Sequence, residues 1–132
     1  MNVDQRGAIL LFAHGARDPD WAAPFRRIQC RIQDASPDTT VELCFLELMS
    51  PPLPEAIAVL AARGITHVTI VPLFLAQGGH LKQDLPRMIA GVKEAHPQIQ
   101  IHLAPAIGDS PALADAIADW ALAEHRAGPE NR

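Results

Sequence analysis

The chain has no tyrosine, and aromatic residues make up only 5% of its 132 residues. Single-stranded nucleic acid would therefore find few rings on which its bases could stack. Basic residues are not in excess either. The formal net charge is −4, which argues against a nucleic-acid backbone or an anionic membrane as the main partner. The two cysteines, Cys30 and Cys44, form no Cys-x-x-Cys motif, so we interpret both as reduced core thiols.

Long hydrophobic runs are also missing. The first apolar run, Ala8 to Ala13, has six residues and follows the acidic Asp4, a pattern that fits neither a signal peptide nor a membrane span. We therefore expect a soluble cytoplasmic protein. The chain has no His-x-x-x-His, no His-Glu-x-x-His, no cysteine–histidine cluster and no P-loop. Any metal site must be assembled by folding from separate segments.

The length and composition favour a single folded domain. Hydrophobic residues make up 48% of the chain, and 132 residues can bury a core without metal or disulfide support. We assign residues 1–126 to one α/β domain and expect the polar tail, residues 127–132, to be frayed. No linker, repeat or low-complexity segment interrupts the pattern.

The hydrophobic pattern alternates four times between a strand and a helix. Apolar or alternating runs predict the strands, and apolar stripes at helical spacing predict the helices. The expected strands cover residues 8–13, 40–46, 67–74 and 99–103, and the expected helices begin near residues 19, 51, 84 and 110. The last helix should turn Leu113, Ile117, Trp120 and Ala121 inward.

Repeated strand–helix units predict a parallel sheet with helices on both faces. The first and third strands are nearly continuous apolar runs, as in central strands, whereas the second and fourth alternate, as edge strands can. This gives the order 2-1-3-4, half of a flavodoxin-like sheet. The connections leave strands one and three in opposite directions, and open α/β sheets bind ligands at such a switch point.

Two histidines follow these central strands. His14 comes directly after the first strand and precedes Gly15, while His80 lies in the loop after the third strand, behind Gly78 and Gly79. The glycines allow unusual backbone conformations that expose amides to an anion or let the loop move. Both imidazoles should face one crevice, where they suit metal binding or proton transfer near neutral pH.

Other polar residues near this crevice are candidates for the same site. Glu47 follows the second strand among apolar neighbours, where a carboxylate pairs, binds metal or exchanges protons. Arg17, Lys82 and Arg87 can hold substrate carboxylates. The simpler interpretation is that each is an ordinary solvated charge. Asp18 and Asp84 are interpreted as helix caps.

Four segments resemble the small sirohydrochlorin chelatases of the class II metal chelatase family: LLFAHGARDP, FLELMSPPLPEAI, VPLFLAQGGHLKQDLP and APAIGDSPALADAI. They occur in the family's order and span nearly the whole chain. Longer members carry two such units, so the resemblance implies a homodimer here. One departure is Ala16, where serine is common in the family.

The resemblance implies a lyase that needs no ATP or organic cofactor and inserts a divalent metal into sirohydrochlorin, a carboxylate-rich tetrapyrrole. The metal would be Co²⁺ or Fe²⁺, with Ni²⁺ also suited to the same ligands, and the pathway would be cobalamin or siroheme biosynthesis. His14 and His80 would bind the metal and accept pyrrole protons, with Glu47 as acidic partner. The substrate would be bound by Arg17, Gly78, Gly79 and Lys82.

Three other readings remain open from the sequence. A metal-binding or carrier protein would use the same two histidines without a tetrapyrrole cleft. A histidine phosphatase carries Arg-His-Gly at its phosphorylated histidine, but here Ala13 occupies the arginine position, so the phosphate clamp is missing. A plain flavodoxin-like interaction domain would need neither histidine.

Overall fold

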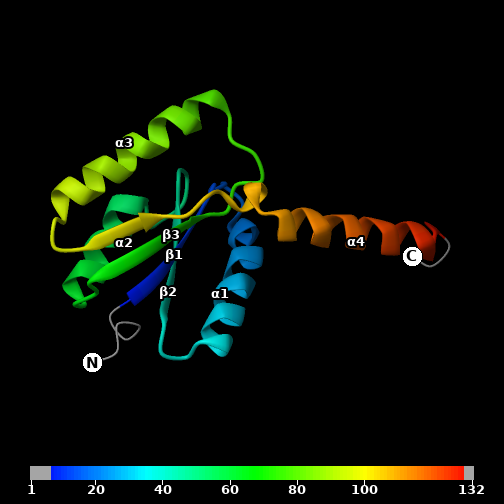
Figure 1. Cartoon of the computed structure of the whole chain (residues 1–132), viewed down its shortest axis with the longest axis horizontal. Coiled ribbons are helices and arrows are strands. Elements are labelled where there is room, and N and C mark those ends of the chain that lie inside the picture. The colour runs from blue at the N-terminus through cyan, green and yellow to red at the C-terminus, as the bar shows by residue number, and fades with distance from the viewer. Residues whose placement is uncertain (1–6, 130–132) are drawn as a thin grey trace.

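The computed structural model describes residues 7–129, which form a three-layer α/β domain with one helix extending from it (Figure 1). Its strands and longer helices alternate as the sequence pattern predicts. They are β1 (Gly7–Ala13), α1 (Ala23–Ala35), β2 (Thr40–Phe45), α2 (Leu53–Ala62), β3 (His67–Pro72), α3 (Gly79–Ala95), β4 (Gln100–Leu103) and α4 (Pro111–Ala127). Two short 3-10 helices, η2 (Pro19–Ala22) and η3 (Ile107–Asp109), precede α1 and α4. None of the helices within the described range is long and apolar enough to cross a bilayer.

The four strands are parallel and lie in the order β2-β1-β3-β4, which confirms the predicted topology. The central strand β1 is buried along nearly its whole length, whereas the edge strand β4 exposes Gln100 and His102. The other central strand, β3, alternates between buried and half-buried residues, so of the two central strands β1 alone is continuously buried. The ends of β1 and β3 lie at the switch point.

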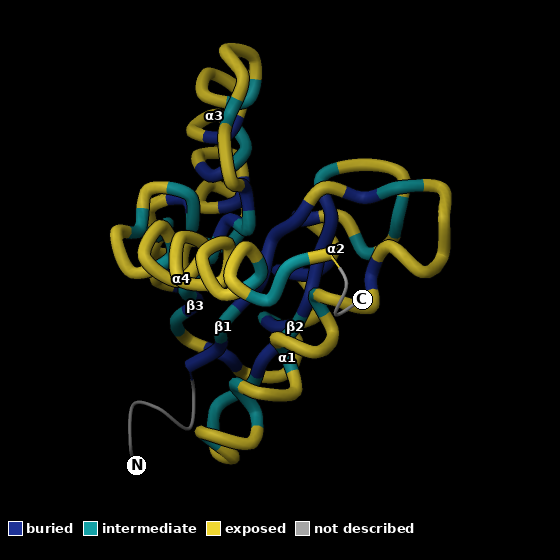
Figure 2. The backbone as a smooth tube through the Cα atoms, turned by 90° about the vertical axis from the view of Figure 1, so that its right-hand side faces the viewer, coloured by how far each residue is buried: buried dark blue, intermediate teal, exposed yellow. Residues whose placement is uncertain are grey.

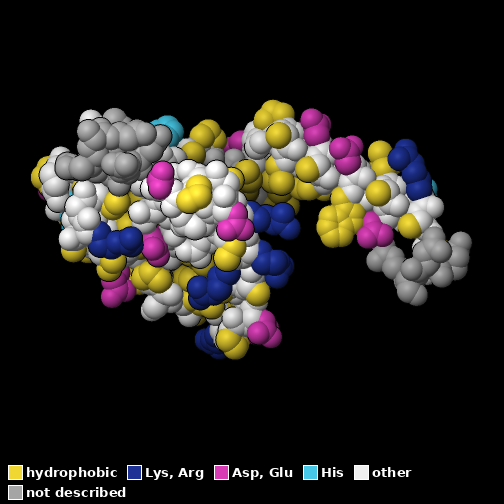
Figure 3. Space-filling model, turned by 90° about the horizontal axis from the view of Figure 1, so that it is seen from below, with side chains coloured by type: hydrophobic (Ala, Val, Ile, Leu, Met, Phe, Trp, Pro, Cys, Tyr) yellow, Lys and Arg dark blue, Asp and Glu magenta, His cyan; other side chains and the backbone are white. Residues whose placement is uncertain are grey.

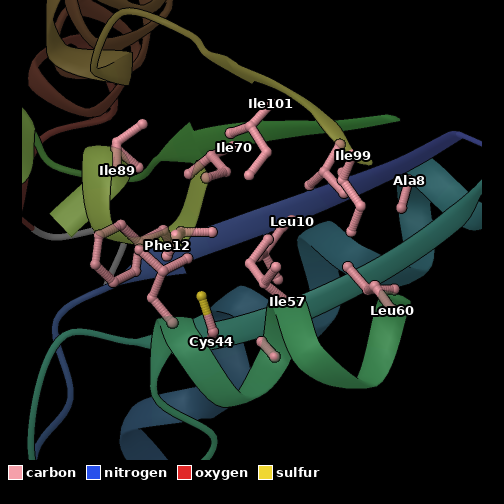
Figure 4. Close-up of a cluster of buried hydrophobic side chains, with 14 of the residues drawn as sticks. Ala8, Leu10, Phe12, Cys44, Ile57, Leu60, Ile70, Ile89, Ile99 and Ile101 are labelled. Carbon is pink, nitrogen blue, oxygen red and sulfur yellow. The ribbon is translucent and has the colours of Figure 1, made fainter. Parts of the chain in front are cut away.

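The larger core lies between the sheet and helices α2 and α3. In Figure 4, Leu10, Phe12 and Ile70 from the sheet meet Ile57 from α2 and Ile89 from α3. All five side chains are buried, and each full burial of this kind contributes roughly 1.5–3 kcal/mol. This packing fixes where the ends of β1 and β3 lie.

A smaller core fills the other face, beneath α1. Leu11, Val41 and Phe45 from the sheet meet Phe25 and Ile32 from α1, although α1 buries none of its own residues completely. Helices therefore cover both faces of the sheet, as predicted.

Helix α3 begins earlier than predicted. It starts at Gly79, and the Lys82 N–H donates to the Gly78 carbonyl, so Asp84 lies within the helix and does not cap it. The prediction relied on Pro86 as a first-turn residue, but Pro86 lies inside the helix. The apolar stripe extends back to Leu81, which packs against the larger core and stabilises the first turns.

The segment before α2 is extended where the sequence predicted helix. The Phe45 N–H donates to the Pro51 carbonyl at 3.0 Å, which holds this segment beside the end of β2 until α2 begins at Leu53. Strands β2 and β3 end at Phe45 and Pro72, slightly earlier than expected. Asp18 does cap η2, since its carboxylate accepts from the Asp20 N–H at 2.9 Å.

Helix α4 does not pack on the domain as predicted. It projects from the body, and the exposed colouring along it is nearly continuous (Figures 1 and 2). No residue of α4 is buried, so the expected inward stripe of Leu113, Ile117, Trp120 and Ala121 has no core beneath it. Of the predicted tail, residues 130–132 lie outside the described part of the chain.

The two cysteines differ in environment. Cys44 lies in the larger core, where burial raises the pKa of its thiol to about 12. Cys30 is exposed on α1, so its assignment as a core residue was wrong. Gln29 faces the edge of the sheet, and successive residues of a helix are rotated by about 100°. Cys30, the next residue, is therefore turned away from the sheet.

Iodoacetamide should therefore modify Cys30 and leave Cys44 unmodified in the folded protein at pH 8. The thiolate is the reactive form, and Cys44 keeps its proton well above this pH. Peptide mass spectrometry should find label on Cys30 alone before denaturation and on both residues in urea. Equal native labelling would contradict the burial of Cys44.

Candidate active site

The site lies where β1, β2 and β3 end, and backbone hydrogen bonds hold these three exits together. The Leu46 N–H donates to the Ala13 carbonyl at 2.8 Å, and the Leu73 N–H donates to the Phe12 carbonyl at 2.7 Å. Pairing therefore continues beyond β2 and β3. It places the residues that follow the three strands at one edge of the sheet.

His14 and Glu47 meet at this edge. The Nδ1 atom of His14 lies 3.2 Å from Oε1 of Glu47, and their side chains are 47% and 41% exposed. The two residues are 33 positions apart, so only the parallel pairing of β1 with β2 brings them together. Their positions after β1 and β2 predict that both lie at this edge, and the structure pairs them.

Two aromatic residues fix the position of His14. Its imidazole lies against Phe74, with ring centroids 4.8 Å apart and planes inclined at 56°. The indole Nε1–H of Trp21 donates to the His14 carbonyl at 2.7 Å. Backbone and ring are thus held separately, so the imidazole has little freedom to turn.

The contact with Glu47 has a chemical consequence for His14. An ionised carboxylate beside Nδ1 favours the tautomer with its proton on Nδ1, which leaves the Nε2 lone pair free. Nε2 makes no hydrogen bond to any residue that the structure describes. A partly exposed imidazole with a free Nε2 can bind a divalent metal or accept a proton.

Gly15 allows the two loops to approach. A Cβ atom on Gly15 would lie 1.8 Å from the Glu47 carbonyl oxygen, a distance at which atoms overlap. The same carbonyl accepts from the Met49 N–H at 2.8 Å, across Leu48 at a φ of 67°. This is a three-residue turn of the rarer, strained type, and strain of this kind often lies at functional sites.

His80 lies in the first turn of α3, not in the preceding loop as predicted, and its side chain is exposed. No hydrogen bond or ion pair joins it to another described residue. Within residues 7–129, no three histidine, cysteine, aspartate or glutamate side chains form a group that could hold a metal ion. His14 and Glu47 therefore form the pair that the structure brings together, and His80 belongs to a separate element, α3.

Gly78 and Gly79 have ordinary backbone conformations in this structure, contrary to the sequence-based expectation. Gly78 has a φ of −73°, neither glycine has a positive φ, and a Cβ on either would meet nothing within 4 Å. Gly78 is the N-cap residue of α3 and supplies no side-chain cap. The first amides of α3 are therefore not covered by a capping side chain.

A cavity of about 340 Å³ opens beyond the ends of β3 and β4. Lys82, Gln77 and Asp109 contribute its polar lining, and Lys82 lies two residues after His80 on α3. Arg17 is exposed in the loop after His14. Arg87 instead lines a groove between α2 and α3 together with His96, so it lies apart from this cavity.

Several residues of the site were not singled out from the sequence. Phe74 lies in the expected strand 67–74 and Trp21 in the expected helix that begins near residue 19, but the sequence predicts no site role for these two residues or for Gln77 and Asp109. Only Gly15 carried a usable signal, since a glycine directly after a candidate ligand often marks close approach of two backbones. Aromatic contacts across different loops have no signature in a single sequence.

The model of the CbiX family matches residues 8–122. The chain belongs to the CbiX family. The match includes the ends of β1, β2 and β3, and therefore His14, Glu47 and His80.

Two curated CbiX-like relatives are named as sirohydrochlorin chelatases. The sirohydrochlorin cobaltochelatase of Methanopyrus kandleri is 35% identical over 82 residues, which are 62% of this chain and 57% of that protein. The sirohydrochlorin ferrochelatase of Priestia megaterium is 30% identical over 117 residues, which are 89% of this chain and 44% of that protein. The chain thus spans about half the length of these relatives.

A solved structure shares the fold at full length. It is described as a putative cobalamin (vitamin B12) biosynthesis CbiX protein from Marinobacter aquaeolei VT8. The TM-score is 0.81 at 32% identity, and the comparison covers 92% of this chain and 99% of that one. The CbiX fold therefore includes nearly all of the domain described above.

We expect Gly15→Ala to destabilise the protein and separate His14 from Glu47, because the added methyl group meets a backbone carbonyl that cannot move aside freely. The free energy of unfolding should fall by about 2 kcal/mol, as in other overpacked sites. Urea denaturation measures this change.

Gly91→Ala is the matched control. A Cβ at Gly91 meets nothing within 4 Å and lies inside α3, so alanine should raise the stability by about 0.5–1 kcal/mol. Equal effects of the two substitutions would show that the close approach at Gly15 does not matter.

Proposed function

We propose that this chain inserts Co²⁺ or Fe²⁺ into sirohydrochlorin, a tetrapyrrole rich in carboxylates. The observation that carries the proposal is the His14–Glu47 pair, which lies at the switch point of a CbiX-family domain. The names of the relatives add support, since one is called a cobaltochelatase and the other a ferrochelatase.

His14 would hold the incoming metal through Nε2. Glu47 would keep the proton on Nδ1, as carboxylates do behind metal-binding histidines. A site with few protein ligands leaves coordination positions open for the pyrrole nitrogens. An imidazole site also binds Co²⁺ or Fe²⁺ less firmly than a closed thiolate site, so the ion can be released into the macrocycle.

Insertion also requires two protons to leave the pyrrole nitrogens. His80, in the first turn of α3, is the second candidate ligand and proton acceptor, since an imidazole nitrogen can bind a metal or accept a proton. His14 follows β1 and His80 lies on α3, so we propose that the edge of the macrocycle lies between these two elements. Glu47 would accept the second pyrrole proton when His14 is bound to the metal.

The cavity beyond β3 and β4 is a candidate site for one edge of the substrate. Its volume of about 340 Å³ is at the lower end for ligand pockets, so it would take part of a tetrapyrrole and leave the rest exposed. Lys82 in its wall and Arg17 near His14 would pair with substrate carboxylates. The uncapped N–H groups that follow Gly78 and Gly79 would donate hydrogen bonds to another substrate carboxylate.

We also propose that the protein acts as a homodimer in the cytoplasm. The matched region is 44% of the Priestia ferrochelatase, and a second copy of this unit would supply the remaining length. The exposed free thiol of Cys30 suits a reducing compartment.

The direct test is anaerobic mixing of the protein with sirohydrochlorin and Co²⁺, followed by visible absorbance. A chelatase makes the metallated spectrum appear faster than it does without protein. Binding of Co²⁺ without acceleration would instead identify a metal carrier and overturn the proposal. Parallel runs with Fe²⁺ and Ni²⁺ rank the metals by rate.

His14→Ala and His80→Ala should each slow insertion by roughly 100-fold or more, the usual effect of removing an acid–base group. Both side chains are exposed, so neither change should affect folding. His96→Ala at the other end of α3 is the control and should retain the normal rate. Normal turnover by either site variant would remove that histidine from the mechanism.

Glu47→Gln should weaken Co²⁺ binding by about 10- to 100-fold, because the neutral amide no longer supports His14 with a negative charge. Isothermal titration with Co²⁺ measures the affinity. Glu42→Gln is a close control, since Glu42 is also an exposed carboxylate in a 3.2 Å ion pair, with Arg63. A loss of affinity in the control equal to that in Glu47→Gln would mean that the pair with His14 plays no special part.

A further inference from the structure

Three exposed hydrophobic side chains, Trp21, Leu48 and Leu75, border the candidate site. They are 42%, 63% and 67% exposed. Outside α4, the described residues expose only two other large hydrophobic side chains, Ile28 and Val59. On the face of the body seen in Figure 3, hydrophobic side chains are scattered among polar and charged ones, as is normal for a protein surface. We call Trp21, Leu48 and Leu75 the apolar rim, because their grouping around one site is not of that kind.

Trp21 is held in place beside His14. Its indole N–H donates to the His14 carbonyl at 2.7 Å, and its ring meets Phe25 of α1 edge to face, with centroids 6.0 Å apart. The polar group of the indole and one side of the ring therefore both have partners. The rest of the side chain stays open to solvent, so the domain presents a fixed aromatic surface next to His14.

Leu48 is exposed in a backbone conformation that does not favour leucine. It is the central residue of the turn in which the Met49 N–H donates to the Glu47 carbonyl, and its φ is 67°. Glycine and asparagine adopt this region more readily than leucine does. Neither burial nor the backbone conformation therefore accounts for a leucine at this position. An outlier of this kind beside a candidate ligand points to a contact made by the side chain outside its own chain.

Leu75 connects the imidazole with the cationic part of the site. It follows Phe74, whose ring lies against His14, and it lines a cavity of about 270 Å³ together with Lys82. Lys82 also lines the cavity of about 340 Å³ beyond β3 and β4, so the two cavities adjoin. The Leu75 backbone is held tightly, since a Cβ on Gly108 would lie 1.8 Å from its carbonyl oxygen. The apolar rim therefore extends from the imidazole to the cation.

We propose that the apolar rim binds the flat face of the tetrapyrrole and thereby positions its ring nitrogens near Nε2 of His14. The inference rests on the proposed function and adds the contacts that the ring itself makes. A tetrapyrrole is a flat apolar ring whose charged groups lie only at its periphery, so cations alone would leave its face in water. Trp21 supplies an aromatic surface for that face, and Leu48 and Leu75 supply aliphatic contacts on either side.

Salt distinguishes contacts with the ring face from contacts with the substrate carboxylates. The pairing of carboxylates with Lys82 and Arg17 weakens as the salt concentration rises, because exposed charges are screened. Burial of apolar surface involves no pair of charges, so sodium chloride does not screen it. Loss of a rim side chain should therefore lower the affinity by a similar factor at low and at high salt.

Leu48→Asn separates a binding role of Leu48 from a structural one. Asparagine tolerates a φ of 67° better than leucine does, so the variant should be at least as stable as wild type in urea denaturation. Its affinity for metal-free sirohydrochlorin, measured anaerobically by absorbance titration, should nevertheless fall by about 10-fold, the usual effect of losing one large apolar contact. Val59→Asn removes an exposed aliphatic side chain from α2 and is the matched control, which should bind as tightly as wild type does.

Leu75→Ser and Leu75→Met test the second aliphatic contact by the same titration. Serine removes the apolar side chain, so affinity should fall by about 10-fold at low and at high sodium chloride concentration alike. Methionine has nearly the volume of leucine and should restore most of the affinity that serine loses. Lys82→Gln should behave differently, with a loss of affinity that is largest at low salt and shrinks as salt is added.

The results separate this inference from the proposed function. If wild type binds sirohydrochlorin and inserts metal while Leu48→Asn and Leu75→Ser bind as tightly as wild type does, the apolar rim plays no part and the proposed function stands. Loss of affinity at low salt alone would mean that the rim acts only through the neighbouring cations, which also overturns the inference. A wild type that does not bind sirohydrochlorin overturns both proposals.

Discussion

The close approach of the loop after β1 to the loop after β2 is the constraint on which the site depends. Gly15 lies against the Glu47 carbonyl, and no other residue fits there. Because the two backbones touch, the side chains that flank this contact, His14 and Glu47, are held within hydrogen-bond distance. The parallel pairing of β1 and β2 supplies the register, and the glycine removes the last steric obstacle.

The arrangement of the sheet could be predicted because burial leaves a direct record in the sequence. The nearly continuous apolar runs of β1 and β3 marked them as central strands, which gave the order of all four strands. In the structure β1 is buried along nearly its whole length, whereas β3 is buried at every second residue. The order in turn placed His14 at the switch point. The start of α3 was missed because Pro86 was taken as a helix boundary, although the packing of Leu81 extends the helix by a further turn.

The contact partners within the site were beyond the reach of the sequence. The pairing of His14 with Glu47 depends on the tight turn at Leu48, whose positive φ no sequence pattern of a leucine predicts. The same holds for α4. Its apolar stripe predicted an inward-facing side, but in the structure no core lies beneath the stripe. Local patterns report that burial is needed, whereas the identity of the partner is a property of the assembled fold.

Phe74 touches both the core and the site. Its ring meets Phe12 edge to face at 5.6 Å and lies 4.8 Å from the imidazole of His14. The residue is buried and lies two residues after β3, so any change in its size moves the hydrophobic packing and the imidazole of His14 together. Variation of the site that leaves the domain folded therefore has to proceed through the exposed rim, because the wall behind the imidazole is part of the core.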